Sequence, residues 1–485
     1  NKLKKLLSLF MFLFFMVVLI GCVPTEEDPE EVTITYAAWN LGSVEANNLE
    51  RRMIEAFMVE YPHITVDIVE RPKVPDPGNP ENEIDMNWDE MLASMAATGT
   101  LPDVYLHGNV PTAIINGWAH DVVEVMADDE EFLNISSDIG MAAVYQGKYF
   151  GIPSAAFHFG FFINNTLFED ANIDLPTFGM TWEDLLVAAE EVATQPTDGT
   201  GIVGLEGVSS LFEWLPAQFD GDLGWYTFDG TDFNLDSQAF ADAMAEQQKY
   251  YGPDKGTYAP YVLEATTNEQ RDEWYTGWPM GNGKHAIKWD GTWSFGWIVP
   301  NTLNEENPMY GMEFDFIGTP VVVDGVQRVP VTMDFMLVGQ GTEHEEEAYA
   351  FAKWMGFGKD GYLKRIEIAT ANPTSGSVNF APLQQDDDLY EAYFNLFPAG
   401  TMTEYRKVLE HDSFIIEGIK FIPGYVEARW AGNYGTIGET SYSIGALIDA
   451  IRDGNVQLAD VATQLNNRVN IIYQEAKAAL DDALE

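Results

Sequence analysis

Residues that commonly carry enzyme chemistry are present in the chain, but their spacing matches no catalytic motif. The sequence contains no Gly-x-Ser-x-Gly, no His-Glu-x-x-His and no phosphate-binding loop, because Gly283-Lys284 is followed by His285. Seven histidines are scattered without the spacing of a metal site. We therefore expect no enzyme, no cofactor and no metal. A glycosidase, which needs only two carboxylates, stays open as an alternative.

Acidic residues dominate the charge of the chain. There are 77 acidic and 25 basic residues, and the formal net charge is −52. Such a balance excludes nucleic acid as a partner, because phosphates require a basic surface. It favours a saline habitat, where the self-repulsion is screened, over a surface that is merely very soluble. Two acidic clusters, Asp220-Gly221-Asp222 and Asp386-Asp387-Asp388, leave calcium binding open as a weaker alternative.

The single thiol of the chain, Cys22, follows a segment with the features of a secretory signal. Lys2, Lys4 and Lys5 precede an apolar run over residues 6–20, which is shorter than the roughly 20 residues that span a bilayer. Leu19-Ile20-Gly21-Cys22 resembles the lipobox of bacterial lipoproteins. That resemblance implies that residues 1–21 are a signal peptide, that Cys22 is lipidated, and that the protein is anchored on the outer face of the cell membrane.

Residues 22–31 predict an acidic, solvated tether between the lipid and a folded domain. Cleavage at Cys22 removes three lysines and no acidic residue, which changes the net charge from −52 to −55. The remaining chain is long enough for two lobes of ordinary size. With one cysteine, no internal disulfide is possible.

Alternating and helical patterns predict an α/β fold. Residues 32–39 and 64–69 alternate as strands do, and Leu49, Met53 and Phe57 between them predict a helix. This strand–helix–strand unit is typical of a parallel sheet. Further strands are expected at 102–106, at 147–164 as two strands separated near Pro153, at 286–289 and at 313–317. Further helices are expected at 88–97, from Thr181, from 235–237 to Gly252, at 343–355 and at 457–484, and a surface insertion at 71–87.

Several short motifs occur in one order along the chain. They are Leu-Pro-Asp-Val at 101–104, Gly-Lys-Tyr-Phe-Gly-Ile-Pro at 147–153, Thr-Trp-Glu-Asp-Leu at 181–185, Gly-Lys-His-Ala-Ile at 283–287, Gly-Thr-Trp at 291–293 and Glu-Glu-Ala-Tyr-Ala-Phe at 346–351. In this order they resemble the family 1 extracellular solute-binding proteins of ABC importers, which include sugar-type, maltose-binding-protein-like members. The resemblance covers nearly the whole chain after Cys22.

This resemblance implies a two-lobed, periplasmic-binding-protein-like fold of type II, with hinge strands between two discontinuous lobes. The expected first lobe comprises residues 32–152 and 311–357, and the second comprises 153–310 and 358–485. The implied function is to capture a carbohydrate in the cleft between the lobes and deliver it to ABC importer permease subunits, as a monomer. A peptide or polyamine receptor stays open as a second alternative.

Sugar sites combine aromatic platforms with amides and carboxylates, and the thirteen tryptophans supply ample platforms. Trp39 ends the first predicted strand, where open α/β sheets place ligands. By analogy with the family, the other expected ligand-binding residues are His107, Asn109, Phe157, His158, Asp290, Trp293, Asp334, Trp430 and Tyr442. Trp182, just inside a helix start, is expected to pack in the core.

Two departures from the family pattern concern the identity of the sugar. His107 stands where maltose binders have a tryptophan, and Phe157 stands where they have a cleft carboxylate. The particular sugar therefore does not transfer from the resemblance.

Overall fold

The computed structural model describes residues 29–322, 325–371, 378–411 and 413–485. The predicted signal peptide, Cys22 and the first part of the tether lie outside the described residues. Within them, a mixed sheet has the strand order β2-β1-β5-β12-β8-β10-β9, and β11 and β13 pair with β8 and β12. The strands are β1 (Val32–Ala37), β2 (Ile64–Ile68), β5 (Val104–His107), β8 (Ile152–Asn164), β9 (Val203–Glu206), β10 (His285–Gly291), β11 (Phe314–Phe316), β12 (Val329–Val338) and β13 (Phe414–Ile416).

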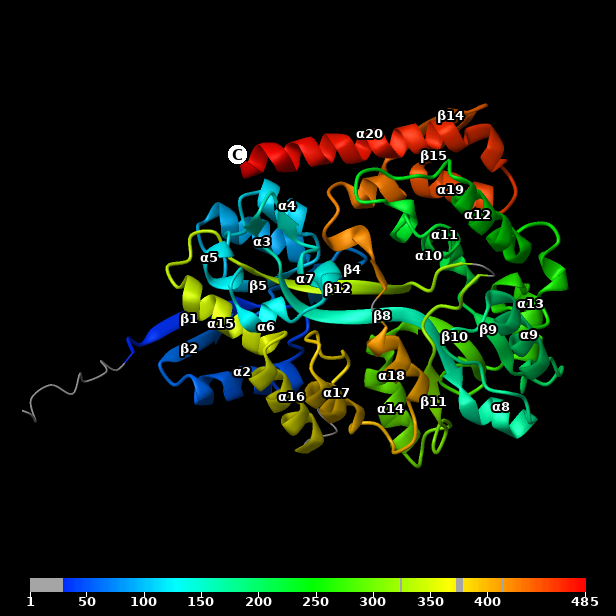
Figure 1. The fold of residues 1–485 in the computed structure, drawn as a ribbon, viewed down its shortest axis with the longest axis horizontal. Helices are drawn as coiled ribbons and strands as arrows, with labels where there is room; N and C mark the ends of the chain where they lie inside the picture. The colour runs from blue at the N-terminus through cyan, green and yellow to red at the C-terminus, as the bar shows by residue number, and fades with distance from the viewer. Residues whose placement is uncertain (1–28, 323–324, 372–377, 412) are drawn as a thin grey trace, which may run out of the picture.

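Strands β8 and β12 run through the middle of the molecule and connect its two halves (Figure 1). The first part of β8 pairs antiparallel with β12, and the part from Phe159 to Asn164 pairs with β10 and β11. The far end of β12 pairs with β5. Each of the two strands therefore contributes to the sheet of one half and continues toward the other.

The prediction of two strands separated near Pro153 is confirmed, but the break does not fall at the proline itself. It falls before Ile152, after the short strand β7 (Lys148–Tyr149), and Pro153 lies inside β8. Proline has no N–H to donate to a neighbouring strand. The partner of Pro153 on β12 is Phe335, and the register of β12 shifts between Asp334 and Phe335. This irregularity, a β-bulge, lets the strand continue through the proline.

Most predicted helices are confirmed, and side-chain caps define their starts. Asn48 caps α2 (Leu49–Glu60) by accepting a hydrogen bond from the Arg51 N–H, and Leu49, Met53 and Phe57 are buried. Thr181 caps α9 (Trp182–Val192), and Trp182 is buried as expected. Other predicted helices are α3 (Trp88–Ala97), α12 (Gln238–Tyr251), α15 (Glu345–Met355) and α20 (Leu458–Leu484).

The remaining helices pack around the sheet or on other helices. They are α4 (Val110–Ile115), α5 (Val123–Met126), α6 (Glu130–Leu133), α7 (Ser137–Gly140), α8 (Asn165–Ala171), α10 (Leu211–Trp214), α11 (Pro216–Phe219), α13 (Asn268–Trp274), α14 (Phe295–Leu303), α16 (Lys359–Ala371), α17 (Asp387–Phe394), α18 (Thr403–Glu410) and α19 (Ile444–Arg452).

Two hydrophobic cores stabilise the molecule. The first contains residues of β1, α2, β5, α15 and β12 and extends past the crossing strands to α14, β11 and α18, and the second contains residues of α9, α12, β10 and α19. Helix α20 contributes to both, because Leu465 and Val469 lie in the second core and Leu480 and Leu484 in the first. The helix therefore spans the two halves, as Figure 1 shows along the top of the molecule.

The exact lobe boundaries remain a prediction. Helix α16, which the predicted boundaries assign to the second lobe, packs against α2 and α15 of the first. Arg365 of α16 forms a bidentate ion pair with Glu50 of α2. Residues 359–371 therefore lie beside the helices of the first lobe.

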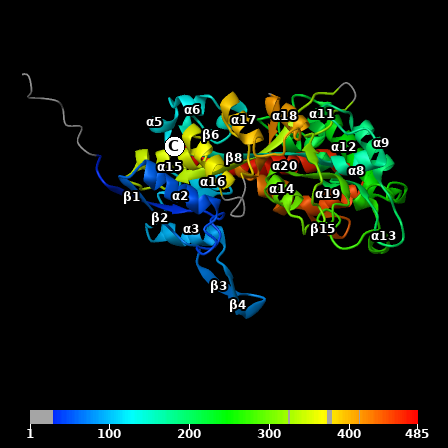
Figure 2. The same ribbon diagram turned by 90° about the horizontal axis from the view of Figure 1, so that it is seen from below.

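The insertion at 71–87 forms a β-hairpin of β3 (Lys73–Asp76) and β4 (Asn79–Asp85). The hairpin projects from the first lobe (Figure 2), and all residues of β4 are exposed. Its base is held by the Arg71 side chain, whose Nε donates to the Met86 carbonyl at 2.6 Å.

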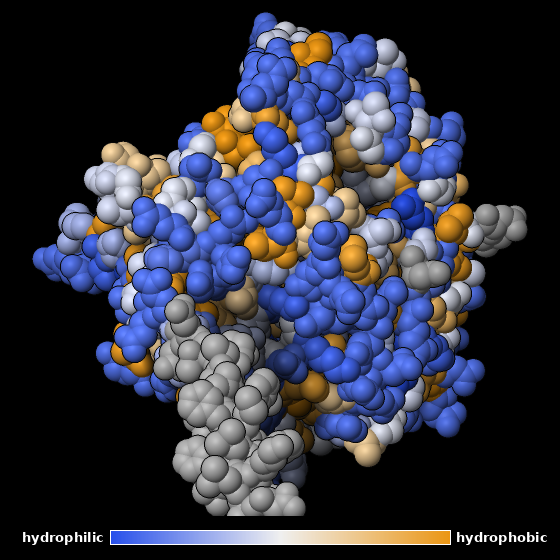
Figure 3. Space-filling model, turned by 60° about the vertical axis from the view of Figure 1, so that its left-hand side comes forward, coloured by the Kyte–Doolittle hydropathy of each residue, from blue (hydrophilic) through white to orange (hydrophobic). Residues whose placement is uncertain are grey.

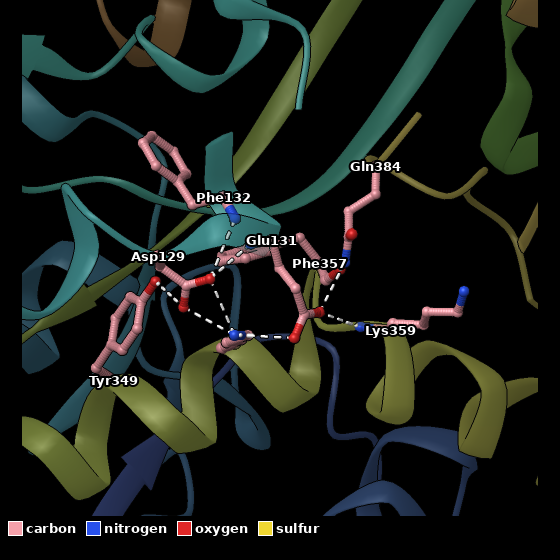
Figure 4. A network of polar contacts seen from close by, with 8 residues as sticks. Asp129, Glu131, Phe132, Tyr349, Phe357, Lys359 and Gln384 are labelled. Atoms are coloured by element: carbon pink, nitrogen blue, oxygen red, sulfur yellow. Dashed lines mark hydrogen bonds and ion pairs between the residues drawn. The ribbon is translucent and has the colours of Figure 1, made fainter. Parts of the chain in front are cut away.

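A polar network stabilises the first lobe on the side of α15 (Figure 4). The Lys353 Nζ of α15 contacts Asp129 at 2.8 Å and Glu131 at 3.0 Å. Gln384 Nε2 donates to Glu131 at 2.8 Å and to the Phe357 carbonyl at 2.8 Å. Burial alone would raise the pKa of both carboxyls, but the bonds from Lys353 and neighbouring N–H groups lower them.

Candidate functional site

A pocket of about 430 Å³ lies between the two halves. Its walls come from the loop after β1, the start of α2, strands β5, β8 and β12, the turn after β10, the end of α15, helix α16, residues 379–380 and the segment that follows β13. Segments from both halves therefore meet at this pocket, and β8 and β12 contribute residues to its floor.

Aromatic rings line the pocket from both halves: Trp39, Phe157, Trp293 and Phe380. Trp39 and Trp293 are 38% and 36% exposed, whereas Phe157 is buried. The Trp39 ring meets the edge of Trp88 at 5.8 Å between centroids, which fixes its orientation. An exposed and oriented indole offers its face to a ligand.

Trp293 owes its position to the turn that follows β10. It lies in a 3₁₀ turn, Thr292–Ser294, and its ring contacts the Phe157 and Phe159 rings at 5.6 and 5.2 Å. A Cβ at Gly291 would come within 2.3 Å of the indole, so the ring requires glycine there. Asp290 organises the turn by accepting bonds from the Gly291 N–H and the Ser294 hydroxyl, both at 2.8 Å.

Two ion pairs lie in the pocket wall. Asp334 of β12 pairs with Lys420, and Glu50 pairs with Arg365. Arg365 is 2% exposed and also donates to the Met355 carbonyl at 2.8 Å. Because each carboxylate has a cationic partner, the charges of these four side chains balance. Polar side chains complete the wall: Asn40, Asn48, Ser154, Thr332 and Asn379.

A buried carboxyl, Glu417, lies directly behind the pocket wall. The hydroxyl of Thr332, which lines the pocket, donates to it at 3.4 Å, and the Ile419 N–H donates at 3.0 Å. Burial, with the nearby Glu213 carboxylate, raises the pKa of Glu417 to about 7. The 3₁₀ turn that Glu417 caps, Gly418–Lys420, carries Lys420 to Asp334.

The structure brings four of the ten expected ligand-binding residues to this pocket: Trp39, Phe157, Trp293 and Asp334. Asp290 acts through the turn that carries Trp293. Arg365, Glu50, Lys420 and Phe380 were not predicted. Asn48 was also missed, although an asparagine directly before a helical pattern is a recognisable N-cap signal.

The two histidines among the expected residues are buried outside the pocket lining. His107 is 1% exposed, accepts the Asn109 N–H at 3.0 Å through Nδ1, and has a pKa lowered by burial. His158 is 5% exposed, and burial lowers its pKa to about 4. Both imidazoles are therefore neutral near pH 7.

The other three expected residues also lie outside the lining. Asn109 caps α4 by accepting the Thr112 N–H. Trp430 is 38% exposed, with the Arg429 guanidinium 4.8 Å from its ring. Tyr442 lies on β15 (Thr440–Ser443), which pairs with β14 (Asn433–Ile437), and packs on the second core.

In the part of the chain that the structure describes, no group of three or more His, Cys, Asp or Glu side chains is arranged to hold a metal ion. Of the acidic clusters, Asp386 caps α17, and it and Asp388 pair with Lys359.

Comparisons with known proteins agree with this architecture. The family model of the bacterial extracellular solute-binding proteins matches residues 45–357. The sequence matches none of the curated proteins at a significant level.

Solved structures with the same fold cover nearly the whole chain. The sugar-binding protein MalE from Xanthomonas citri aligns with a TM-score of 0.63 at 13% identity, covering 93% of this chain and 99% of that one. An ABC substrate-binding protein from Listeria monocytogenes, in complex with cycloalternan, gives 0.60 at 16% identity, with 91% and 99% covered. The cyclic α-maltosyl-1,6-maltose binding protein from Arthrobacter globiformis gives 0.60 at 16%, with 92% and 100% covered.

These likenesses show a two-lobed α/β fold of the periplasmic-binding-protein type, with the pocket between the lobes. The family consists of binding proteins rather than enzymes. The match over residues 45–357 therefore shows that this chain belongs to the bacterial extracellular solute-binding proteins.

Proposed function

We propose that the protein captures a carbohydrate in the pocket between its lobes and delivers it to the permease of an ABC importer. The observation that carries this proposal is the pair of exposed tryptophans, Trp39 and Trp293, on the walls of one polar pocket. Indole faces stack on the apolar faces of sugar rings, while amides and charged groups bond the hydroxyls at their edges. Two structures of the same fold, the Listeria protein in complex with cycloalternan and the Arthrobacter protein that binds cyclic α-maltosyl-1,6-maltose, support this class of solute.

The charge of the pocket argues against a polyamine. A polycation requires carboxylates without partners, but Glu50 and Asp334 are already paired with Arg365 and Lys420. A balanced set of charges suits a neutral ligand with many hydroxyls, because each hydroxyl both donates and accepts.

A thermal-shift screen of residues 32–485 tests the ligand class. The panel contains mono- and oligosaccharides, spermidine and short peptides. A sugar at one hundred times its dissociation constant is expected to add about 2.7 kcal/mol to the free energy of unfolding. Stabilisation by spermidine or a peptide alone would overturn the proposal, and so would sugar hydrolysis by the purified protein, which indicates a glycosidase.

We further propose that the chain acts as a monomer held on the outer face of the membrane through acylated Cys22. Within the described residues, no helix has the length and apolarity needed to cross a membrane. Two or more acyl chains anchor a protein stably, since each buried methylene contributes about 0.8 kcal/mol. Delivery would then occur by closure of the lobes over the sugar and docking on the permease.

Cys22→Ser tests the anchor. The substituted protein is expected to lack lipid and to keep residues 1–21, as measured by mass spectrometry of the intact chain. A wild-type protein that retains those residues and carries no acyl group contradicts the anchor and leaves sugar capture unaffected.

A further inference from the structure

An exposed tryptophan outside the pocket, Trp278, is the centre of a second surface on the outside of the molecule. Its side chain is 58% exposed, and its ring lies 5.1 Å from the Trp297 ring at an interplanar angle of 40°. Trp297 belongs to α14 and is half-buried. Two neighbouring indoles, one supporting the other, form a broad aromatic platform.

The loop that carries Trp278 holds the platform firmly. The Asn282 N–H donates to the Trp278 carbonyl at 3.1 Å, and the Asn282 side chain donates to the Thr276 carbonyl at 2.7 Å. A Cβ at Gly281 would come within 2.4 Å of the Trp278 ring. The indole therefore lies flat against a glycine that leaves room for it, which limits its rotation.

The loop that carries Trp278 also contributes polar groups to a neighbouring cavity, whose lining does not include Trp278 itself. This cavity of about 280 Å³ is lined by Thr200, Thr276, Asn282 and Lys284, with Tyr275 and Pro279 from the same loop. The Lys284 Nζ has neither a hydrogen bond nor an ion pair within the described parts of the chain, although the protein is strongly acidic. A stacking surface in the same loop as an unpaired ammonium and threonine hydroxyls that can still accept hydrogen bonds suits a carbohydrate subsite.

The platform is connected to the pocket through one short helical segment. Trp293 lines the pocket, and Trp297 follows it by four residues on the continuous turn formed by Thr292–Ser294 and α14. Residues four apart on a helix lie on the same face, about 6 Å apart along the axis. Trp297 contacts Trp278, and Trp293 is linked to Trp297 through this backbone segment rather than by a ring contact. The three indoles thus mark an aromatic track from the pocket toward the outer surface.

We propose that this track is an outer subsite that binds the units of an oligosaccharide which extend beyond the pocket. The proposal rests on carbohydrate capture in the pocket. It places the inner sugar units on Trp293 and Trp39, the next units against Trp297, and the outermost on Trp278 beside Lys284. The protein would then select longer chains over disaccharides.

Calorimetry with oligosaccharides of increasing length tests the subsite. The probes are the malto-, xylo- and manno-oligosaccharides from disaccharide to hexasaccharide, and the protein is the full chain in a detergent without a sugar head group. Affinity is expected to rise with length in the series that binds. Trp278→Ala is expected to weaken hexasaccharide binding by about fivefold to tenfold and to leave disaccharide binding unchanged.

Phe219→Ala, which removes an aromatic ring that is 41% exposed elsewhere, is the matched control and should change neither affinity. Equal loss for all lengths on Trp278→Ala, or affinity independent of length in the wild type, overturns the outer subsite while pocket binding stands. A variant that binds every length normally but no longer supports uptake by cells marks the loop as an importer contact, and also overturns it. If no series binds at all, both the pocket assignment and the subsite fail.

Discussion

Trp293 is partly exposed and is supported by two neighbouring rings. Its contribution to ligand binding can therefore be separated from its contribution to folding stability. If Trp293 is a stacking platform, its truncation to alanine should weaken sugar binding by about thirtyfold or more, which corresponds to about 2 kcal/mol. Because the ring is 36% exposed, the melting temperature should change little. Calorimetry and thermal unfolding of Trp293→Ala measure both effects on one variant.

Trp214→Ala provides the comparison for a tryptophan of the core. Trp214 is fully buried and stacks on Trp289 at 5.5 Å, so its loss should cost about 3–5 kcal/mol of stability. If Trp293→Ala behaves like Trp214→Ala, or binds its sugar normally, Trp293 is not a platform.

Two buried glutamates, Glu264 and Glu417, are expected to make the free energy of unfolding depend on pH. Burial raises the pKa of Glu264 and of Glu417 to about 7. The Glu264 Oε1 accepts two N–H groups, but its Oε2 is buried without a partner. In the unfolded chain a glutamate titrates near 4.3, so the folded state binds more protons between about pH 4.5 and 7. The free energy of unfolding therefore falls as the pH rises through that window.

Glu264→Gln should remove the contribution of Glu264 to this pH dependence, because the amide stays neutral at every pH. We expect the variant to be more stable than the wild type at pH 8, by on the order of 1–3 kcal/mol, and the difference to vanish below pH 5. Buried histidines such as His158 titrate in the same range, so the difference between the two proteins in urea unfolding is the quantity to measure. Glu55→Gln, at an exposed position, is the control. A difference that stays constant from pH 5 to 8 contradicts the prediction.

Among the secondary-structure elements, the β3–β4 hairpin is a segment on which the packing of the lobes does not depend. Its two strands pair only with each other, and β4 is exposed throughout. Replacing residues 73–85 by two glycines should change the free energy of unfolding by less than about 1 kcal/mol, because a surface segment contributes little buried apolar area. Denaturant unfolding measures this, and a loss of several kcal/mol would show that the hairpin packs on the lobe.

Elements with strong local signals could be predicted from the sequence, and those that depend on distant contacts could not. The spacing of Leu49, Met53 and Phe57 sets the buried face of α2, and Thr181 caps α9 through its own side chain. The break between β7 and β8 was expected near Pro153, but its exact place was not, because a bulge on another strand lets β8 run through the proline. That bulge, at Asp334, has no signature in the sequence around Pro153.

The residues of the pocket also divide into those that could be predicted from the sequence and those that could not. Trp39 and Trp293 could be expected to line it, because one follows a strand and the other matches a family motif. Asp334 was expected by analogy, but its partner Lys420 is 86 residues away, and Glu50 and Arg365 are 315 residues apart. The sequence around each residue gives no sign of such a pair. The partners meet only once the first lobe has folded and the crossing strands are in place.

For the whole molecule, charge is the property that sets the response to solvent. Figure 3 shows hydrophilic residues over most of one face, with hydrophobic ones in small separate groups. Carboxylates outnumber basic side chains 77 to 25, so most of them lack a cationic partner and repel one another. Folding concentrates this charge, and the repulsion acts against the compact state.

Stability should therefore rise with salt. Between about 0.01 and 1 M sodium chloride, the Debye length falls from about 30 to about 3 Å, which screens the repulsion between exposed carboxylates. The paired charges of the pocket, such as the buried Arg365 with Glu50, are screened less and should keep their contribution. Melting temperatures of residues 32–485 across this range measure the effect, with sucrose at matched osmolality as a control for general solvent exclusion. A flat or falling curve in salt would show that surface carboxylates are far enough apart in the folded state for their repulsion not to oppose folding.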